Sequence, residues 1–289
     1  MKRYYKLLII TCALFMTACI KEGYDSENCP DDHKVTVVWP SAPTDGNVKD
    51  VVITVINPDG SVETITAGSN TILEDGKNLL IGSSAGEKDE VTIVGEKVTV
   101  NTNPDGTCCE PGGFKGGSLE IEIGPNMENI TDIEVPVTWQ TRPLEVHVKF
   151  VGYAAQAISD VNGTVEGIAI SRLLNNGFPP LDGTKRPTAI KEGSMNYHLE
   201  QSGANDFFQC SKRLLGIQGT TKQNLSLQVT FSDGTVADYP FDITTDMDNF
   251  HTENVEDPWI IEITLRIGAD FSATIEDWKV GPESWLEAQ

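Results

Sequence analysis

The sequence predicts an all-β protein, and two features of its residue pattern support this fold class. Apolar and polar residues alternate with a period of two over most of the chain, and the same runs are rich in β-branched residues. Almost no stretch has the i, i+3, i+4 spacing of an amphipathic helix. The runs form two groups, so we expect two tandem β-sandwich domains, residues 33–141 and 142–289.

The first group of alternating runs begins at residues 34–39, where Val35, Val37 and Trp39 share one face. Residues 51–56 and 61–67 flank Asn57-Pro58-Asp59-Gly60, which favours a turn and predicts a hairpin. We expect these strands to form one sandwich with five later ones, residues 79–83, 90–94, 97–102, 118–123 and 132–139.

The second group follows Gln140-Thr141-Arg142-Pro143, where Pro143 is expected to interrupt strand pairing. Residues 144–151 open this group, and residues 175–193 are rich in Gly and Pro, which predicts a long loop. Ser232-Asp233-Gly234 predicts a second hairpin. The expected strands are residues 144–151, 161–173, 224–231, 235–243, 259–267 and 272–280.

The first 18 residues are typical of an export signal. Lys2, Arg3 and Lys6 precede a short apolar run, and Met16-Thr17-Ala18 leads to Cys19. This arrangement resembles the lipobox of bacterial lipoproteins and predicts that Cys19 carries the lipid, with an acidic tether at residues 19–32. An ordinary secretory signal is the alternative. No retention Asp follows Cys19, which favours the outer membrane. Lys21 followed by acidic residues resembles a surface-export signal and implies exposure at the cell surface, although a solvated acidic tether would have the same pattern.

The composition is strongly acidic and argues against nucleic acid as a partner. Without residues 1–18 the chain keeps 18 of 21 basic residues and all 43 acidic residues, a net charge of −25. The acidic residues are spread over most of the chain, as is usual for solubility outside the cell. No second apolar segment is long enough to span a membrane, so attachment depends on the lipid.

Four cysteines remain for disulfide bonds after removal of the signal and lipidation of Cys19. Cys108 and Cys109 are adjacent and point to opposite sides if the chain is extended, so a bond between them is disfavoured. We expect Cys29 to pair with Cys108 or Cys109, which would leave Cys210 alone. Other pairings of the four thiols stay open. The spacing does not fit a metal site.

The sequence contains no convincing catalytic motif, and we expect neither enzymatic activity nor a cofactor. Phosphate loops and nucleophile elbows are absent, and His147 is expected on the solvent side of a strand. Residues 246–249 have oxygen ligands for calcium but lack the pattern of a calcium loop. Trp39, Trp139, Trp259 and Trp278 fit core positions, whereas Trp285 follows the last strand and is a candidate partner contact.

The order of these features resembles that of fimbrillin-type lipoproteins of Bacteroidetes, in particular the minor subunits that anchor a fimbria. The resemblance rests on the lipobox at Cys19, Cys29-Pro30 in the tether, the strand ending at Trp39, the Pro58-Asp59-Gly60 turn, the junction near Arg142, residues 162–167 and the closing residues 271–278. It implies two transthyretin-like sandwiches and contact with fimbrial subunits by β-strand addition.

In polymerising relatives, the resemblance implies that an arginine-directed protease removes the first strand. This chain has no arginine between Cys19 and Thr141, so the lipid and the first strand should stay attached, as an anchor requires. Lysines are present in this part of the chain, and a lysine-directed protease would weaken this argument. The candidate edges for a partner strand are residues 144–151 and 272–280, each of which could instead be a paired interior strand.

These observations predict a fimbrial anchor or accessory subunit at the outer membrane, with a role in adhesion. The alternative is a non-enzymatic surface lipoprotein that binds glycan for a nutrient uptake system. Exposed aromatic side chains grouped on one loop face would favour that alternative. A secreted hydrolase is the third possibility and requires a cleft with convergent carboxylates.

Overall fold

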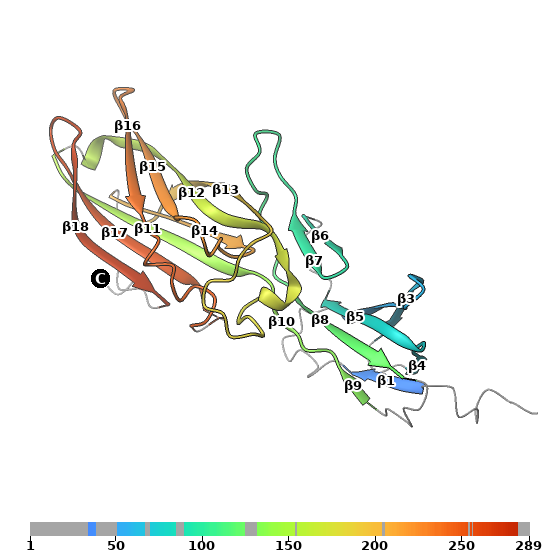
Figure 1. Cartoon of the computed structure of the whole chain (residues 1–289). Coiled ribbons are helices and arrows are strands. Elements are labelled where there is room, and N and C mark those ends of the chain that lie inside the picture. The colour runs from blue at the N-terminus through green and yellow to red at the C-terminus, as the bar shows by residue number, and fades with distance from the viewer. Residues whose placement is uncertain are drawn as a thin grey trace, which may run out of the picture.

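The computed structural model describes residues 34–38, 51–66, 70–84, 90–124, 132–153, 155–203, 206–253, 255 and 257–282. Within these residues the regular structure is β-strand, apart from the short 3-10 helices η1 (Ala155–Ala157) and η2 (Leu174–Asn176). The all-β prediction is therefore confirmed. The molecule is elongated, with β1 at one end and β16 and β18 at the other (Figure 1).

The N-terminal strands form two sheets around a small core. One sheet has the order β4-β1-β9, and the other has the order β10-β8-β5-β2-β3. Their shared core contains Val37, Ile53, Leu80 and Val135. The strands are β1 (Lys34–Val38), β2 (Val51–Ile56), β3 (Val62–Thr66), β4 (Asn70–Ile72), β5 (Gly76–Ser84), β8 (Lys115–Ile123), β9 (Asp132–Glu134) and β10 (Thr138–Trp139).

The predicted hairpin at residues 57–60 is confirmed by the pairing of β2 with β3. Gly60 has a φ of 84°, a value that glycine adopts readily. Its amide donates to the Asn57 carbonyl, and the Ser61 amide donates to the Asp59 carboxylate at 2.7 Å. These two bonds explain why the Asn-Pro-Asp-Gly sequence ends one strand and starts the next.

The C-terminal strands form a sandwich-like pair of layers that stays open along one side. The strand order is β16-β15-β12-β13-β14-β11-β17-β18. β13 and β14 are paired at only two positions, so the link between the two layers is short. The large apolar core lies between the layers. The strands are β11 (Arg142–Gly152), β12 (Ile158–Leu173), β13 (Lys191–Gln201), β14 (Phe207–Leu214), β15 (Asn224–Phe231), β16 (Val236–Asp242), β17 (Trp259–Ile267) and β18 (Ala273–Gly281).

Three expectations about this second group were wrong. The predicted loop at residues 175–193 ends earlier, because β13 begins at Lys191. β13 and β14 were not among the expected strands, although Met195, Tyr197 and Leu199 alternate along β13 and are buried. Pro143 does not interrupt pairing, since it lies in β11 opposite Arg213. The domain division at residues 141 and 142 stays a prediction.

The hairpin of β6 (Val91–Val94) and β7 (Lys97–Val100) departs from the predicted single sandwich. Instead of joining the N-terminal sheets, β7 pairs with the last residues of β12, and Thr99 lies opposite Ser171. Around it, Val98 and Phe114 from the N-terminal half pack with Leu174 and Leu215 from the C-terminal half. The two halves therefore share a ladder and an apolar cluster, which we call the junction.

A buried arginine, Arg172, forms hydrogen bonds with carbonyl and amide oxygens at the junction. The Arg172 side chain donates to the Leu215 carbonyl at 2.7 Å, to the Gln140 carbonyl at 2.6 Å and to Gln140 Oε1 at 2.8 Å. Burial lowers the pKa of Arg172 to about 9. Gln140 Nε2 donates in turn to the carbonyls of Gly116 and Leu174. This network satisfies polar groups that would otherwise be costly to bury.

Candidate functional site

Several residues singled out in the sequence cannot be placed. Cys19, Cys29, Trp39 and Trp285 lie outside the described residues. The lipidation site, the disulfide pairing and the Trp285 contact therefore stay predictions. In the described part of the chain, no helix is long and apolar enough to cross a membrane.

The adjacent cysteines point to opposite sides, as extended geometry predicts. Cys108 packs in the C-terminal core, and its burial raises the pKa of the thiol to about 11. Cys109 is half-buried, packs against the junction cluster and contacts Asn103 Oδ1 at 3.4 Å. Cys210 lies on β14, where burial raises its pKa to about 12. All three are free thiols in this structure.

The two candidate edge strands have different surroundings. β11 is an interior strand, because it pairs with β14 on one side and with β17 on the other. Within the described strands, β18 pairs only with β17, and at the other end of the strand order β16 pairs only with β15. Residues 144–151 are thus excluded as a partner edge, whereas β18 has one edge without a described partner strand.

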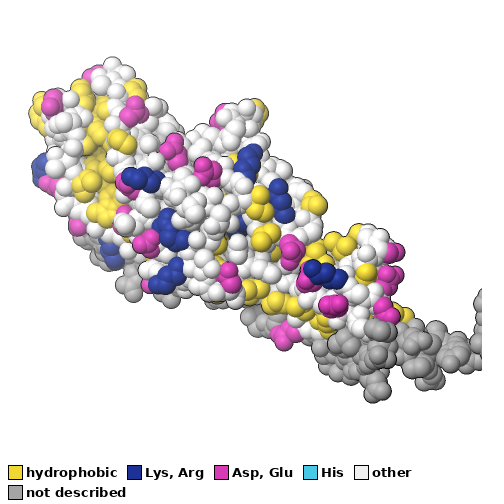
Figure 2. Space-filling view, viewed as in Figure 1, with side chains coloured by type: hydrophobic (Ala, Val, Ile, Leu, Met, Phe, Trp, Pro, Cys, Tyr) yellow, Lys and Arg dark blue, Asp and Glu magenta, His cyan; other side chains and the backbone are white. Residues whose placement is uncertain are grey.

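β16 and β18 face each other across the open side of the C-terminal layers. Phe241 and Trp278 bring their ring centroids to 5.6 Å, and the Tyr239 hydroxyl donates to the Phe271 carbonyl at 2.7 Å. Ile275, opposite the core residue Leu265, is 49% exposed. Figure 2 shows hydrophobic side chains as a strip over the region between β18 and β16. We call this region the open side.

The edge of β16 is poorly suited to receive another strand. Pro240 lies in its middle and has no amide hydrogen to donate. Asp238 and Asp242 flank it, and both are exposed. Such features protect edge strands from unwanted pairing. Pro240 is the signal in the sequence by which residues 235–243 could have been assigned to an edge.

The edge of β18 is more permissive but contains one irregularity. Its register with β17 shifts between Asp277 and Ile275, so Glu276 is the extra residue of a bulge. The Glu276 side chain forms an ion pair with the Arg266 side chain of β17. The Trp278 amide donates to Asp277 Oδ1 at 2.9 Å. The remaining segment up to Gly281 contains no proline. Of the two edges, β18 is therefore better able to form new backbone hydrogen bonds.

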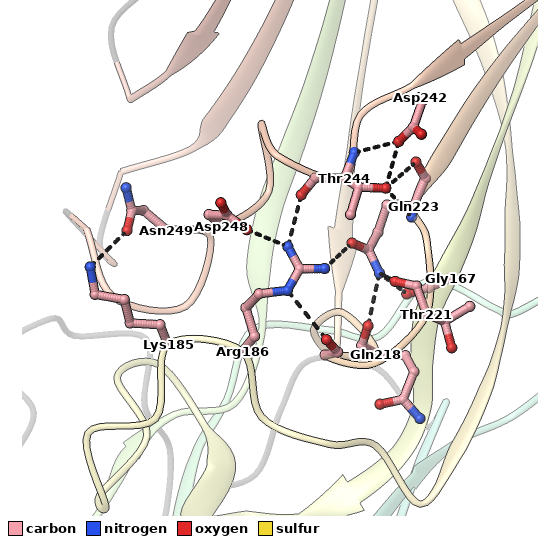
Figure 3. A network of polar contacts seen from close by, with 11 residues as sticks. Gly167, Lys185, Arg186, Gln218, Thr221, Gln223, Asp242, Thr244, Asp248 and Asn249 are labelled. Carbon is pink, nitrogen blue, oxygen red and sulfur yellow. Dashed lines mark hydrogen bonds and ion pairs between the residues drawn. The ribbon is translucent and has the colours of Figure 1, made fainter.

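A network around Arg186 holds the chain that follows β16 (Figure 3). Arg186 donates to the Thr244 carbonyl at 2.7 Å, to Asp248 Oδ1 at 2.6 Å and to Gln223 Oε1 at 2.5 Å. The nearby Asp246 accepts a hydrogen bond from the Trp278 side chain, while burial raises the pKa of Asp246. Arg186 thus fixes the segment that contacts Trp278 at the open side.

Residues 246–249, considered for calcium, are engaged in these protein contacts. Asp248 binds Arg186, and Asn249 Oδ1 accepts from Lys185 at 3.5 Å. Within the described residues, no cluster of His, Cys, Asp and Glu has the arrangement of a metal site. The residues present do not favour a cation here.

His147 is buried, which corrects the expectation of a solvent-side residue. It lies opposite the core-facing Val146 and Val148, yet it is only 2% exposed. Its Nε2 is 3.3 Å from a Glu145 oxygen, and its Nδ1 is 3.5 Å from a Glu262 oxygen without forming a hydrogen bond. Glu262 is fully buried and lies directly opposite His147 on β17. The pairing of strands, invisible in the sequence, produces this cluster.

The tryptophans on described strands are wholly or partly buried. Trp259 is 3% exposed, and Trp139 and Trp278 pack partly against the C-terminal core. Among large hydrophobic residues in the described part, Tyr153 is the one exposed aromatic side chain. The group of exposed aromatics that would favour a nutrient-uptake glycan binder is therefore not seen in this part of the molecule.

Comparisons with known proteins find similar folds among solved structures. It matches no protein-family model and no curated protein. A putative adhesin from Bacteroides ovatus has a TM-score of 0.56 at 11% identity, covering 86% of this chain and 93% of its own. The fimbrial anchor protein Mfa2 from Porphyromonas gingivalis has a TM-score of 0.55 at 10% identity, covering 86% and 97%.

A third similar structure, described as putative polysaccharide binding proteins from Bacteroides thetaiotaomicron, has a TM-score of 0.50 at 10% identity, covering 87% of this chain and 97% of its own. At such identities the likeness shows the fold. The chain thus has the fold of fimbrillin-like surface proteins, in agreement with the resemblance seen in its sequence.

Proposed function

We propose that this chain is a surface lipoprotein that acts as an anchor or accessory subunit of a fimbria at the outer membrane and serves adhesion. The observation that carries the proposal is that two regions lie at opposite ends of the elongated molecule. β1, which follows the predicted lipid at Cys19, lies at the end opposite the open side (Figure 1). A lipid at Cys19 would leave the open side facing away from the membrane, where a filament subunit could reach it.

The pairing of β1 supports the role of an anchor. β1 lies between β4 and β9, and Val37 is fully buried in the N-terminal core. Loss of β1 would open a groove in this core. No arginine lies between Cys19 and Thr141, and Arg142 is itself fully buried. An arginine-directed protease therefore lacks a site from which to release β1, and the chain would keep both its lipid and its first strand.

The free edge of β18 is the proposed contact for the partner. A strand from a fimbrial subunit would add to this edge and cover the apolar strip of the open side, a form of β-strand addition. Asp277 and Asp246 lie beside the strip, so a partner strand with flanking basic residues would fit it. The fold likeness to a fimbrial anchor protein agrees with this assignment but does not identify the partner.

The proposal is tested by gentle shearing of cells that carry the native gene, Cys19→Ala or Ile275→Lys. Size analysis and mass spectrometry then identify what is released. We expect Cys19→Ala to shed filaments together with this chain. We expect Ile275→Lys to keep the chain on the cell but lose the filaments, because a lysine disrupts the apolar strip. Retention of filaments in both variants would refute the anchoring role.

A further inference from the structure

We propose that the outer faces of β11, β14, β13, β12, β15 and β16 form a binding surface for neutral, hydroxyl-rich saccharide chains. The surface contains two hollows that adjoin along β13. One, of about 640 Å³, lies over β11, β13 and β14, and the other, of about 340 Å³, lies over β12, β13, β15 and β16. His198 lines the first hollow and Asn196 the second, two positions apart on the same face of β13.

Strand register places uncharged polar side chains in rows across this surface. Asn162 lies opposite His198 on one side and opposite Gln228 on the other. Thr164 lies in the same way between Asn196 and Ser226. Amides and hydroxyls can each donate and accept hydrogen bonds, which is what the hydroxyl groups of a sugar require. The small side chains of Thr164 and Ser226 leave the middle of the second hollow open.

Hydrogen bonds hold these side chains in place before any ligand binds. Thr164 Oγ1 donates to Asn196 Oδ1 at 2.9 Å, and Gln228 Nε2 donates to Asp238 Oδ1 at 3.1 Å. Asn162 Nδ2 donates to Asp160 Oδ2 at 2.6 Å. Fixed side chains lose less conformational entropy on binding. The rows therefore present a preorganised set of donors and acceptors on rigid strands.

The lining of the hollows selects among ligand classes. Lys212 is the one Lys or Arg side chain in the first hollow, which is also lined by two histidines and by the carboxylates of Glu145 and Glu200. The second hollow has no Lys, Arg or His and includes Asp238. Phosphate, sulfate and uronate groups are therefore disfavoured. Neither hollow offers an exposed aromatic or aliphatic side chain that could anchor a protein partner. Without a ring for stacking, recognition depends on hydrogen bonds, so we expect weak binding that repeated copies on a cell surface would strengthen.

The experiment uses purified chain lacking residues 1–19, displayed as multiple copies on beads. It is applied to an array of neutral oligosaccharides that end in mannose, galactose, glucose or N-acetylglucosamine, with sulfated glycans on the same array. The test variant is Asn162→Ala with Gln228→Ala, and Asn101→Ala is the matched control on the β6–β7 hairpin. Circular dichroism checks that the variants are folded.

We expect the native chain and Asn101→Ala to retain at least one class of neutral glycan, and the double variant to lose at least tenfold in apparent affinity. Failure of the native chain to bind any neutral glycan, or equal binding by the double variant, would overturn the inference. Filament retention in shearing reports on the anchor function separately, because the double variant leaves β18 and Cys19 unchanged.

Discussion

The junction and the open side both contain apolar side chains, but these side chains are buried at the junction and partly exposed at the open side. At the junction, apolar side chains and the Arg172 guanidinium are buried, and the Gln140 and Leu215 carbonyls accept hydrogen bonds from this cation. At the open side, apolar side chains remain exposed beside two strand edges. The difference is that burial holds the two halves together at the junction, whereas the far end keeps apolar side chains exposed to solvent. Substitutions at the two regions should therefore affect different properties.

The largest loss of stability is expected for Arg172→Ala. Its guanidinium binds four oxygens, from Gln140, Leu173 and Leu215, and removal leaves buried carbonyls unpaired beside a cavity. We expect the free energy of unfolding to fall by about 3–5 kcal/mol. Denaturant titration measures it. Arg266→Ala, which removes an exposed ion pair with Glu276, should cost less than about 1 kcal/mol. Equal losses would contradict the structural role of Arg172.

Two adjacent leucines test the apolar part of the junction. Leu174 is fully buried in the junction cluster, whereas Leu173 is 42% exposed. Leu174→Ala should lower the free energy of unfolding by about 2–4 kcal/mol through lost burial and a cavity. Leu173→Ala should change it by about 0.5 kcal/mol or less. Thermal unfolding measures the midpoint temperatures of the two variants. Similar midpoints would mean that the halves are not packed as described.

The pH dependence of stability should reveal His251 near the junction. Burial, reinforced by the charge of Arg172, lowers the pKa of His251 to about 3 from an ordinary 6.5. Between these values the unfolded chain binds a proton and the folded chain does not. Stability therefore falls as pH decreases through this window, by about 1.4 kcal/mol per pH unit from this group.

Unfolding measured from pH 6.5 to 4.5 compares His251→Gln with the native chain. We expect the variant to have a shallower slope, although it is less stable at neutral pH because the Ile217 amide donates to His251 Nε2. His198→Gln, at an exposed position, is the control and should keep the native slope. A native slope in His251→Gln would refute this assignment.

The smallest effect on stability is expected at the open side. Ile275→Ser removes an exposed apolar group, so it should change the free energy of unfolding by about 0.5 kcal/mol or less. Filament retention on cells should nevertheless decrease. A large loss of stability would instead show that this side chain serves the core and not a partner.

The sequence was sufficient to predict what depends on local pattern. The hairpin at residues 57–60 and the alternation of β11 and β17 follow from turn chemistry and period-two burial. The sequence was not sufficient to predict which segments distant in the chain lie side by side. The pairing of β7 with β12, and of His147 with Glu262, depends on tertiary register that no local pattern encodes. Likewise, both candidate edges alternate well, and only the strand order separates interior β11 from edge β18.

The pairing of β7 with β12 also sets the order in which parts of the chain can be completed. The β6–β7 hairpin precedes β12 in the chain, so during synthesis it emerges before its pairing strand. Until β12 follows, Val98 and Val100 can pack against Ile81 and Phe114 but lack the cover of Leu174 and Leu215. Contacts between distant segments form slowly. Slowed synthesis of the C-terminal half should therefore leave this hairpin more vulnerable to proteolysis.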